Sequence, residues 1–223
     1  MSASGRGRRT TVAVIGLGRF GGQVARSLVE LGHDVIGIDA EMAIIDRLAD
    51  EMDHVVQADA TDEAALRQIG VDTVDRVVVG IGENLEASIL TVLALAEIGV
   101  REVWAKAISV RHGRILRAVG ARHVIFPEAE LGDRVAHVIS SKLIDFIDFG
   151  DGFAVAETRV PADAVDRSLT ESALRTRHGI TVIGVGRAGE SFTHAMADTV
   201  LRRDDLLVVA GRTENVERFA AAT

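Results

Sequence analysis

The chain has 223 residues, of which 33 are acidic and 25 basic, so its formal net charge is −8. This charge argues against nucleic acid as the main partner, because phosphate binding needs a basic surface. Cysteine and tyrosine are absent, which excludes disulfides, thiolate chemistry and any reaction that needs a tyrosine acid or base. No apolar stretch is long enough to span a bilayer. Residues 1–10 are basic but precede only a short, glycine-containing apolar run, so we expect a disordered tail on a cytoplasmic protein with no membrane insertion.

From residue 11 onward, strand-like and helix-like patterns alternate with short connections. Apolar, β-branched runs predict six strands, at 11–16, 33–39, 54–59, 74–82, 102–107 and 122–127. Apolar residues at helical spacing predict five helices, at 20–32, 41–52, 61–70, 84–98 and 110–119. This alternation is typical of a parallel sheet with helices on both faces. We therefore expect a doubly wound, Rossmann-type α/β domain over residues 11–127.

The alternation stops after residue 127. Residues 128–150 carry an apolar stripe at helical spacing and end in the turn signal FGDG, which predicts one long connecting helix. Beyond it the pattern predicts strands at 153–161, 179–186 and 204–211 and helices near 168–177 and 213–221. We expect these elements to form a small α+β lobe over residues 151–223.

The pattern Gly-x-Gly-x-x-Gly occurs twice, at Gly16–Gly21 and at Gly184–Gly189, each time with an arginine after the second glycine. The first copy lies between a predicted strand and an amphipathic helix, and Asp39 ends the next strand. In dinucleotide-binding folds such glycines let the backbone approach a phosphate at the helix N-terminus, and the acid accepts hydrogen bonds from the ribose. The second copy has no good helix and no acid after it. We interpret it as a β-hairpin or a strand followed by a loop, with Gly186 and Gly189 in a turn.

Polar residues also follow the ends of the other predicted strands; they are Asp59, Thr61, Glu83, Asn84, Lys106 and Glu128. Because the carboxyl ends of parallel strands line the ligand crevice, we expect this set to contact a ligand. Two cations, Arg19 and Lys106, favour a polyphosphate such as ATP or ADP alongside NAD or NADH. Glu128 would be repelled by phosphates unless a cation lay between them, so we also expect a divalent ion such as Mg²⁺ or Ca²⁺.

No catalytic set accompanies this crevice. The seven histidines lack metal-site spacing, and the predicted C-terminal lobe offers no acid–base cluster. A nucleotide-sensing binding module therefore fits better than an enzyme. A small NAD(P)-dependent oxidoreductase and an NAD(H)-sensing regulator remain open as alternatives.

Several stretches resemble one family in order and spacing: VIGLGRFG, ADATDEAAL, GENLEASILTVLALAEIGV, VWAKA and VIFPEAELGDRVA, followed by LRTRHGITVIGVGRAGE in the C-terminal part. They are similar to the RCK (regulator of K⁺ conductance) subunits of Ktr- and Trk-type potassium uptake systems. The resemblance covers the chain after residue 10 and is closest to the single-copy, KtrA-like regulators. Ala58 departs from a glycine that is common before the Asp-Ala-Thr element.

The resemblance implies a nucleotide-sensing regulatory subunit that gates a membrane K⁺-translocating partner. It also implies a homodimer, usually assembled into an octameric ring, at the inner face of the plasma membrane. By similarity, Gly16, Gly18 and Gly21 hold the phosphates, Asp39 the ribose, Asp59 and Thr61 the adenosine region, Arg19 and Lys106 the terminal phosphates, and Glu128 a divalent cation. Phe20, Ala60 and Asn84 complete the expected nucleotide site. Some relatives bind cyclic di-AMP in the C-terminal lobe, and no residue here decides that question.

Overall fold

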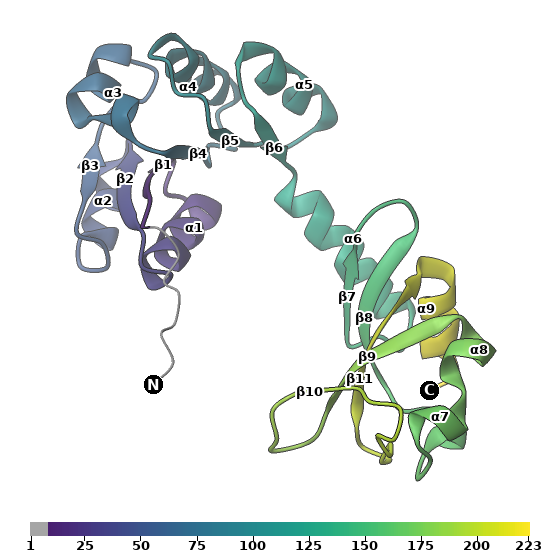
Figure 1. The fold of residues 1–223 in the computed structure, drawn as a ribbon. Coiled ribbons are helices and arrows are strands. Elements are labelled where there is room, and N and C mark those ends of the chain that lie inside the picture. Colours follow the sequence, from purple (N-terminus) through teal and green to yellow (C-terminus); the bar gives the residue numbers. More distant parts are fainter. Residues whose placement is uncertain (1–8) are drawn as a thin grey trace. The chain divides into compact units, whose positions relative to one another are not determined.

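The computed structural model describes residues 9–223, and the chain divides after Glu128 into two compact units (Figure 1). The tail expected over residues 1–10 lies outside the described residues except for Arg9 and Thr10. Thr10 already takes part in the first unit, because its carbonyl accepts a hydrogen bond from the amide of Asp34 at 3.1 Å. Among residues 9–223, no helix is both long and apolar enough to cross a membrane.

The first unit is built on a six-stranded sheet (Figure 1). Its strands are β1 (Thr11–Ile15), β2 (Asp34–Asp39), β3 (Val55–Gln57), β4 (Arg76–Val79), β5 (Val103–Lys106) and β6 (His123–Ile125). They lie in the order β3-β2-β1-β4-β5-β6, and every neighbouring pair is parallel. The sequence-based prediction of a doubly wound parallel sheet is confirmed. The strand order reverses between β1 and β4, which in such sheets opens a crevice at the carboxyl ends of these strands.

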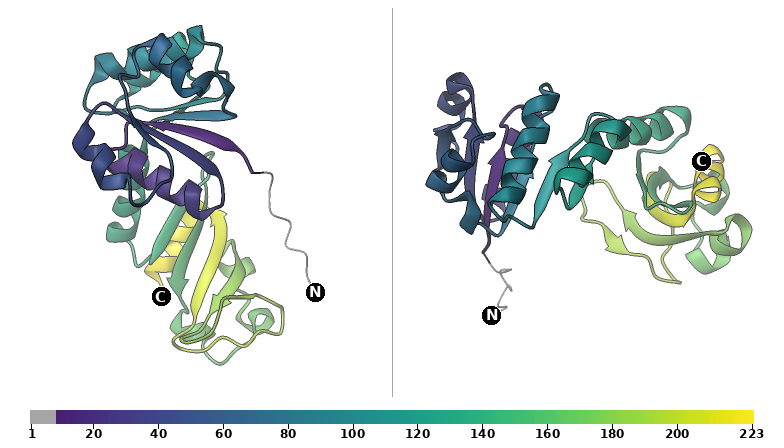
Figure 2. Two further views of the ribbon diagram at one scale, coloured as in Figure 1. Left: turned by 90° about the vertical axis from the view of Figure 1, so that its left-hand side faces the viewer. Right: turned by 90° about the horizontal axis from the view of Figure 1, so that it is seen from above.

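Helices cover both faces of this sheet, as the view from above shows (Figure 2, right). They are α1 (Arg19–Glu30), α2 (Met42–Leu48), α3 (Glu63–Ile69), α4 (Leu85–Glu97) and α5 (Val110–Val119), with a 3₁₀ turn, η1, at Val71–Thr73. On one face, Ala25 of α1 and Leu48 of α2 pack with Val12 and Val14 of β1. Helices α3, α4 and α5 bury their apolar residues on the other face. The continuous apolar runs of the central strands follow from this burial on both sides.

The connecting segment differs from the prediction. The helix expected over 128–150 is α6 (Pro127–Ser140), and Asp145–Asp148 forms strand β7. The hydroxyls of Ser140 and Ser141 both donate to the carbonyl of His137. These bonds supply the donors that a backbone carbonyl in the last turn of a helix otherwise lacks. The apolar residues at 143 and 147 continue the helical spacing by coincidence, because residues 145–148 form a strand that buries Phe146 and leaves Ile147 exposed.

The second unit carries a five-stranded antiparallel sheet in the order β10-β9-β11-β8-β7. Its other strands are β8 (Phe153–Arg159), β9 (Ile180–Gly186), β10 (Thr193–His194) and β11 (Leu206–Arg212). Its helices are α7 (Leu169–Ser172), α8 (Leu174–His178) and α9 (Thr213–Ala221), with a 3₁₀ turn, η2, at Ala162–Ala164. Phe146 of β7 and Phe219 of α9 are fully buried in its core. The predicted α+β architecture of this lobe is confirmed.

Candidate functional site

The loop between β1 and α1 turns so tightly that glycine is required at two positions. Gly16 has a backbone φ of +82°, a value that residues other than glycine rarely adopt. A Cβ atom on Gly21 would lie 1.9 Å from the carbonyl oxygen of Gly16, a distance that no side chain can occupy. Gly80, after β4, is also confined, since its Cβ would lie 2.8 Å from the same oxygen. The three glycines therefore let α1 begin directly against the edge of the sheet.

The N-terminus of α1 has no side-chain cap. Gly18 is its N-cap residue, no side chain there accepts a hydrogen bond, and no acidic residue lies in the first turn. By contrast, α3, α4 and α5 are capped by Asp62, Asn84 and Ser109. A Cβ placed on Gly18 would meet no atom within 4 Å, so the space in front of the helix is open. Free amides and the positive end of the helix dipole facing open space are what a phosphate group needs.

Asp39, at the end of β2, is connected directly to this loop. One carboxylate oxygen accepts a hydrogen bond from the amide of Leu17 at 2.6 Å, and the other accepts from the amide of Glu41 at 3.0 Å. A carboxylate oxygen has capacity for a second donor, so both oxygens can still accept from a sugar hydroxyl. The sequence placed Asp39 at this edge, but it gave no indication of the bond to Leu17.

Asp59 and Thr61 form a local turn after β3. Asp59 accepts hydrogen bonds from the hydroxyl of Thr61 at 2.7 Å and from its amide at 2.9 Å. The hydroxyl bond first, and the amide bond second, lower the pKa of the Asp59 carboxyl below its usual range. Ala60 between them is buried in the core of the sheet. The third helix starts at Glu63 with Asp62 as its cap, so the helix start expected at Thr61 is two residues too early.

Asn84 has a structural task in this structure. Its side-chain oxygen accepts a hydrogen bond from the amide of Ala87 at 3.0 Å and so caps α4. Its position after β4 agrees with the sequence-based expectation, but the oxygen is already engaged by the helix.

Lys106, the last residue of β5, and Glu128, in the first turn of α6, form an ion pair. The amino group of Lys106 lies 2.5 Å from a carboxylate oxygen of Glu128. The Lys106 side chain is 12% exposed and the Glu128 side chain 66%. The Lys106 hydrogen bond is the main cause that lowers the pKa of the Glu128 carboxyl, and the charge of Arg19 adds to it. Arg19 and Lys106 therefore supply positive charge to the same part of the site.

Gly82, which the sequence analysis did not select, shapes the surroundings of Lys106. A Cβ on Gly82 would lie 3.2 Å from the Lys106 amino nitrogen, so Gly82 leaves room for the lysine. On another side, this nitrogen lies 5.6 Å from the centroid of the Phe20 ring, within range of a cation–π interaction. The signal for Gly80 and Gly82 was present in VVVGIGEN, where both directly follow an apolar strand.

The structure thus gathers the glycine loop, Phe20, Asp39, Lys106 and Glu128 at one edge of the sheet. It offers no pre-formed metal centre, because residues 9–223 contain no group of three or more histidines and carboxylates placed to hold an ion. The negative charge of Glu128 is balanced by a lysine of the same unit.

The second glycine pattern has a different structure. After β9, the chain turns and returns as β10, with Thr193 opposite Val185 and His194 opposite Gly184. This confirms the predicted hairpin.

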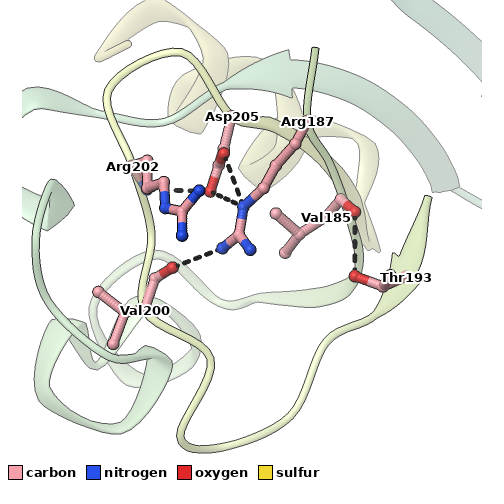
Figure 3. A network of polar contacts seen from close by, with 6 residues as sticks. All are labelled: Val185, Arg187, Thr193, Val200, Arg202 and Asp205. Carbon is pink, nitrogen blue, oxygen red and sulfur yellow. Dashed lines mark hydrogen bonds and ion pairs between the residues drawn. The ribbon is translucent and has the colours of Figure 1, made fainter. Parts of the chain in front are cut away.

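The arginine of this second pattern is held within the lobe (Figure 3). Its Nε donates to the carboxylate of Asp205 at 3.2 Å, and its Nη2 donates to the carbonyl of Val200 at 3.0 Å. Asp205 is almost completely buried and also accepts from the amide of Arg202 at 2.9 Å. Arg187 therefore joins the β9–β10 turn to the loop that precedes β11.

Comparison with known proteins covers both units. A family model described as the TrkA-N domain matches residues 12–127, and one described as the TrkA-C domain matches residues 155–223. The chain is 34% identical over 208 residues to the Ktr system potassium uptake protein C of Bacillus subtilis (strain 168), covering 93% of this chain and 94% of that protein. It is 31% identical over 216 residues to the Ktr system potassium uptake protein A of the same organism, covering 96% and 97%.

A solved structure shares the fold. The crystal structure of the GsuK RCK domain superposes with a TM-score of 0.67 at 21% identity and matches 96% of this chain. The match covers 48% of that structure's chain, so this protein spans about half its length.

Proposed function

The chain belongs to the family that joins a TrkA-N domain to a TrkA-C domain, and from this premise we propose that it is a nucleotide-sensing regulatory subunit of a Ktr-type potassium uptake system. Its partner is a K⁺-translocating membrane protein, and it acts at the cytoplasmic face as a homodimer or a larger ring. It regulates and does not catalyse. The similarity to two Ktr proteins over nearly the whole chain supports this role.

The uncapped N-terminus of α1 is the observation that carries the nucleotide assignment. The amides at Gly18 and the residues after it face open space, where they can receive the phosphates. Asp39 then accepts from the ribose, and the turn at Asp59 and Thr61 lies on the adenosine side. Arg19 and Lys106 contact the terminal phosphates, which favours ADP or ATP.

A sensor must distinguish its two ligands. ATP and ADP change the state of the assembly only if they bind its conformations with different affinity. Arg19 and Lys106 can provide that difference, because they face the end of the phosphate chain where the two ligands differ. A divalent ion such as Mg²⁺ or Ca²⁺ joins this arrangement through Glu128 and the phosphates, since the residues present form no cluster of carboxylates by themselves.

Calorimetric titration of the full chain with ATP, ADP, NAD⁺ and NADH tests the proposal. We expect ADP and ATP to bind, and we expect one of them to change the size or shape of the assembly in light scattering. Binding of NADH without any response to ADP or ATP would contradict it. A pull-down of a K⁺-translocating membrane protein from the native membrane with the full chain tests the partner.

A second candidate, an NAD(H)-binding protein, draws on the position of Asp39. An acid at the end of β2 accepts from the ribose of NAD as readily as from that of ATP. Hydride transfer on a panel of substrates would favour the oxidoreductase form of this candidate. NADH binding without hydride transfer would favour the sensing form.

A further inference from the structure

The amino group of Lys106 lies between two possible partners. On one side is the carboxylate of Glu128 at 2.5 Å. On the other side is the glycine-rich loop, because the same nitrogen lies 5.6 Å from the ring of Phe20, which belongs to the first turn of α1. The side chain is only 12% exposed, so it has little access to solvent as a third option.

The geometry of the loop brings an incoming phosphate close to this lysine. Ile81 packs against Gly16, with its side chain 2.8 Å from the position a Gly16 Cβ would occupy, and the next residue, Gly82, lies under the lysine amino group. Lys106 and the loop at which we propose the phosphates bind therefore both adjoin the short segment Ile81–Gly82, since Ile81 packs on Gly16 and Gly82 on the lysine. A lysine in such a place is attracted to the phosphates as strongly as to a carboxylate.

We propose that Lys106 exchanges partners, bound to Glu128 when the site is empty and to the terminal phosphate when ADP or ATP is present. This inference rests on the proposed function, because it describes how that nucleotide site is regulated. The exchange leaves Glu128 without its cation. Glu128 lies in the first turn of α6, so the nucleotide state is communicated to the helix that leads out of the first unit.

The exchange makes a thermodynamic prediction that simple attraction does not make. Breaking the Lys106–Glu128 pair opposes nucleotide binding, so removal of the Glu128 charge must strengthen it. With EDTA present to exclude divalent ions, we expect Glu128→Gln to raise the affinity for ATP about three- to ten-fold, the factor expected for one partly exposed ion pair. The affinity for AMP, which lacks the terminal phosphates, stays unchanged.

A double-mutant cycle separates exchange from general charge repulsion. In a Lys106→Met chain no ion pair has to be broken, so Glu128→Gln has a clearly smaller effect on ATP affinity than in the native chain. Asp133→Asn, which removes an exposed charge further along α6, is the matched control and leaves ATP affinity unchanged. Equal effects of Glu128→Gln in the two backgrounds, or no effect in either, would overturn the proposal.

The exchange can also be observed at the lysine itself. Lys106 and Lys142 are the only lysines, so a chain labelled with ¹³C at lysine Cε gives two signals, which Lys142→Met assigns. We expect Glu128→Gln to shift the Lys106 signal in the nucleotide-free protein and to leave it unshifted once ATP is bound. A shift of the same size in both states contradicts the exchange. If native protein binds neither ADP nor ATP, the proposed function fails, which is a separate outcome.

Discussion

The two glycine patterns share their spacing and the arginine after the second glycine, but they have opposite surroundings. The loop at Gly16–Gly21 opens a twelve-residue helix whose first amides are free. The stretch at Gly184–Gly189 ends one antiparallel strand and leads into another. Because a helix N-terminus supplies free amides and a favourable dipole for a phosphate, we propose the anion site at the first pattern and not at the second. The comparison shows that the element after the glycines decides the function of the motif.

The two arginines show the same contrast. Arg187 is committed to a buried carboxylate and a carbonyl within its own lobe. Arg19 is exposed and forms no ion pair among residues 9–223, although its charge reaches Glu128. One arginine stabilises the fold, and the other is available to a ligand.

The largest expected difference between the two patterns is in the stability lost when the third glycine is replaced by alanine. Gly21→Ala places a Cβ 1.9 Å from a backbone oxygen, so we expect it to destabilise the first unit by about 3 kcal/mol or more. Gly189→Ala meets no atom within 4 Å and bears only the cost of a positive φ, about 1 kcal/mol. Urea unfolding, with the transitions of the two units followed separately, measures both values. Equal losses would mean that the two loops are less different than their geometry indicates.

Gly18 allows the open helix N-terminus to be closed. Gly18→Asp supplies the missing cap, because aspartate at this position accepts from the first helical amides. We expect ATP affinity to fall about 100-fold, through loss of these donors and through repulsion, while the helix becomes no less stable. Gly18→Ala is the control, since its methyl group enters open space and supplies no acceptor. Retained affinity in Gly18→Asp would show that the phosphates bind elsewhere.

Exchange of the arginines for alanine sharpens the comparison further. Arg187→Ala leaves the carboxylate of Asp205 buried without its cation, and we expect a loss of about 2 kcal/mol in the stability of the second unit. Arg19→Ala changes stability by less than about 0.5 kcal/mol but weakens ATP binding about ten-fold. Thermal unfolding and calorimetry on the same two variants measure these effects. The reverse pattern would reverse our assignment of the two residues.

The smallest expected effect is on the pH dependence of stability, through the carboxyl group of Asp59. The folded pKa of Asp59 lies below its unfolded value, near 3.9, because Thr61 donates two hydrogen bonds to it. This carboxylate therefore contributes stability above pH 3.9 that is lost as the pH falls through the lower, folded pKa. Thr61→Val removes the hydroxyl donor, so the pKa of Asp59 rises toward its ordinary value. Carboxyl ¹³C titration detects the rise, and Thr73→Val, whose hydroxyl bonds to Gly70, leaves it unchanged.

Much of the fold could be predicted because local pattern and burial agree in the first unit. Runs such as TVAVI are buried on both faces, and a continuous apolar, β-branched run is typical of a central parallel strand. The prediction failed at residues 141–148, where Leu143 and Ile147 fit a helical stripe and DFID also fits a strand. The strand forms because residues 145–148 pair with β8, a tertiary contact that the local sequence pattern does not encode.

The positions of the site residues could be predicted, but their contacts could not. Strand ends brought Asp39, Lys106 and Glu128 to one edge, as the parallel topology requires. The bond from Leu17 to Asp39 and the pair between Lys106 and Glu128 depend on side-chain conformations across different loops, which no local pattern encodes. The expectation of a divalent ion at Glu128 rested on repulsion between this carboxylate and phosphates, and it did not include the contact with Lys106.

A crystal structure of the full chain with ADP tests the central claim most directly. We predict the phosphates at the N-terminus of α1, bonded to the amides that follow Gly18, with the ribose on Asp39 and Lys106 turned from Glu128 toward the terminal phosphate. We predict no nucleotide beside Arg187. ADP bound beside Arg187 with α1 left empty would contradict the account.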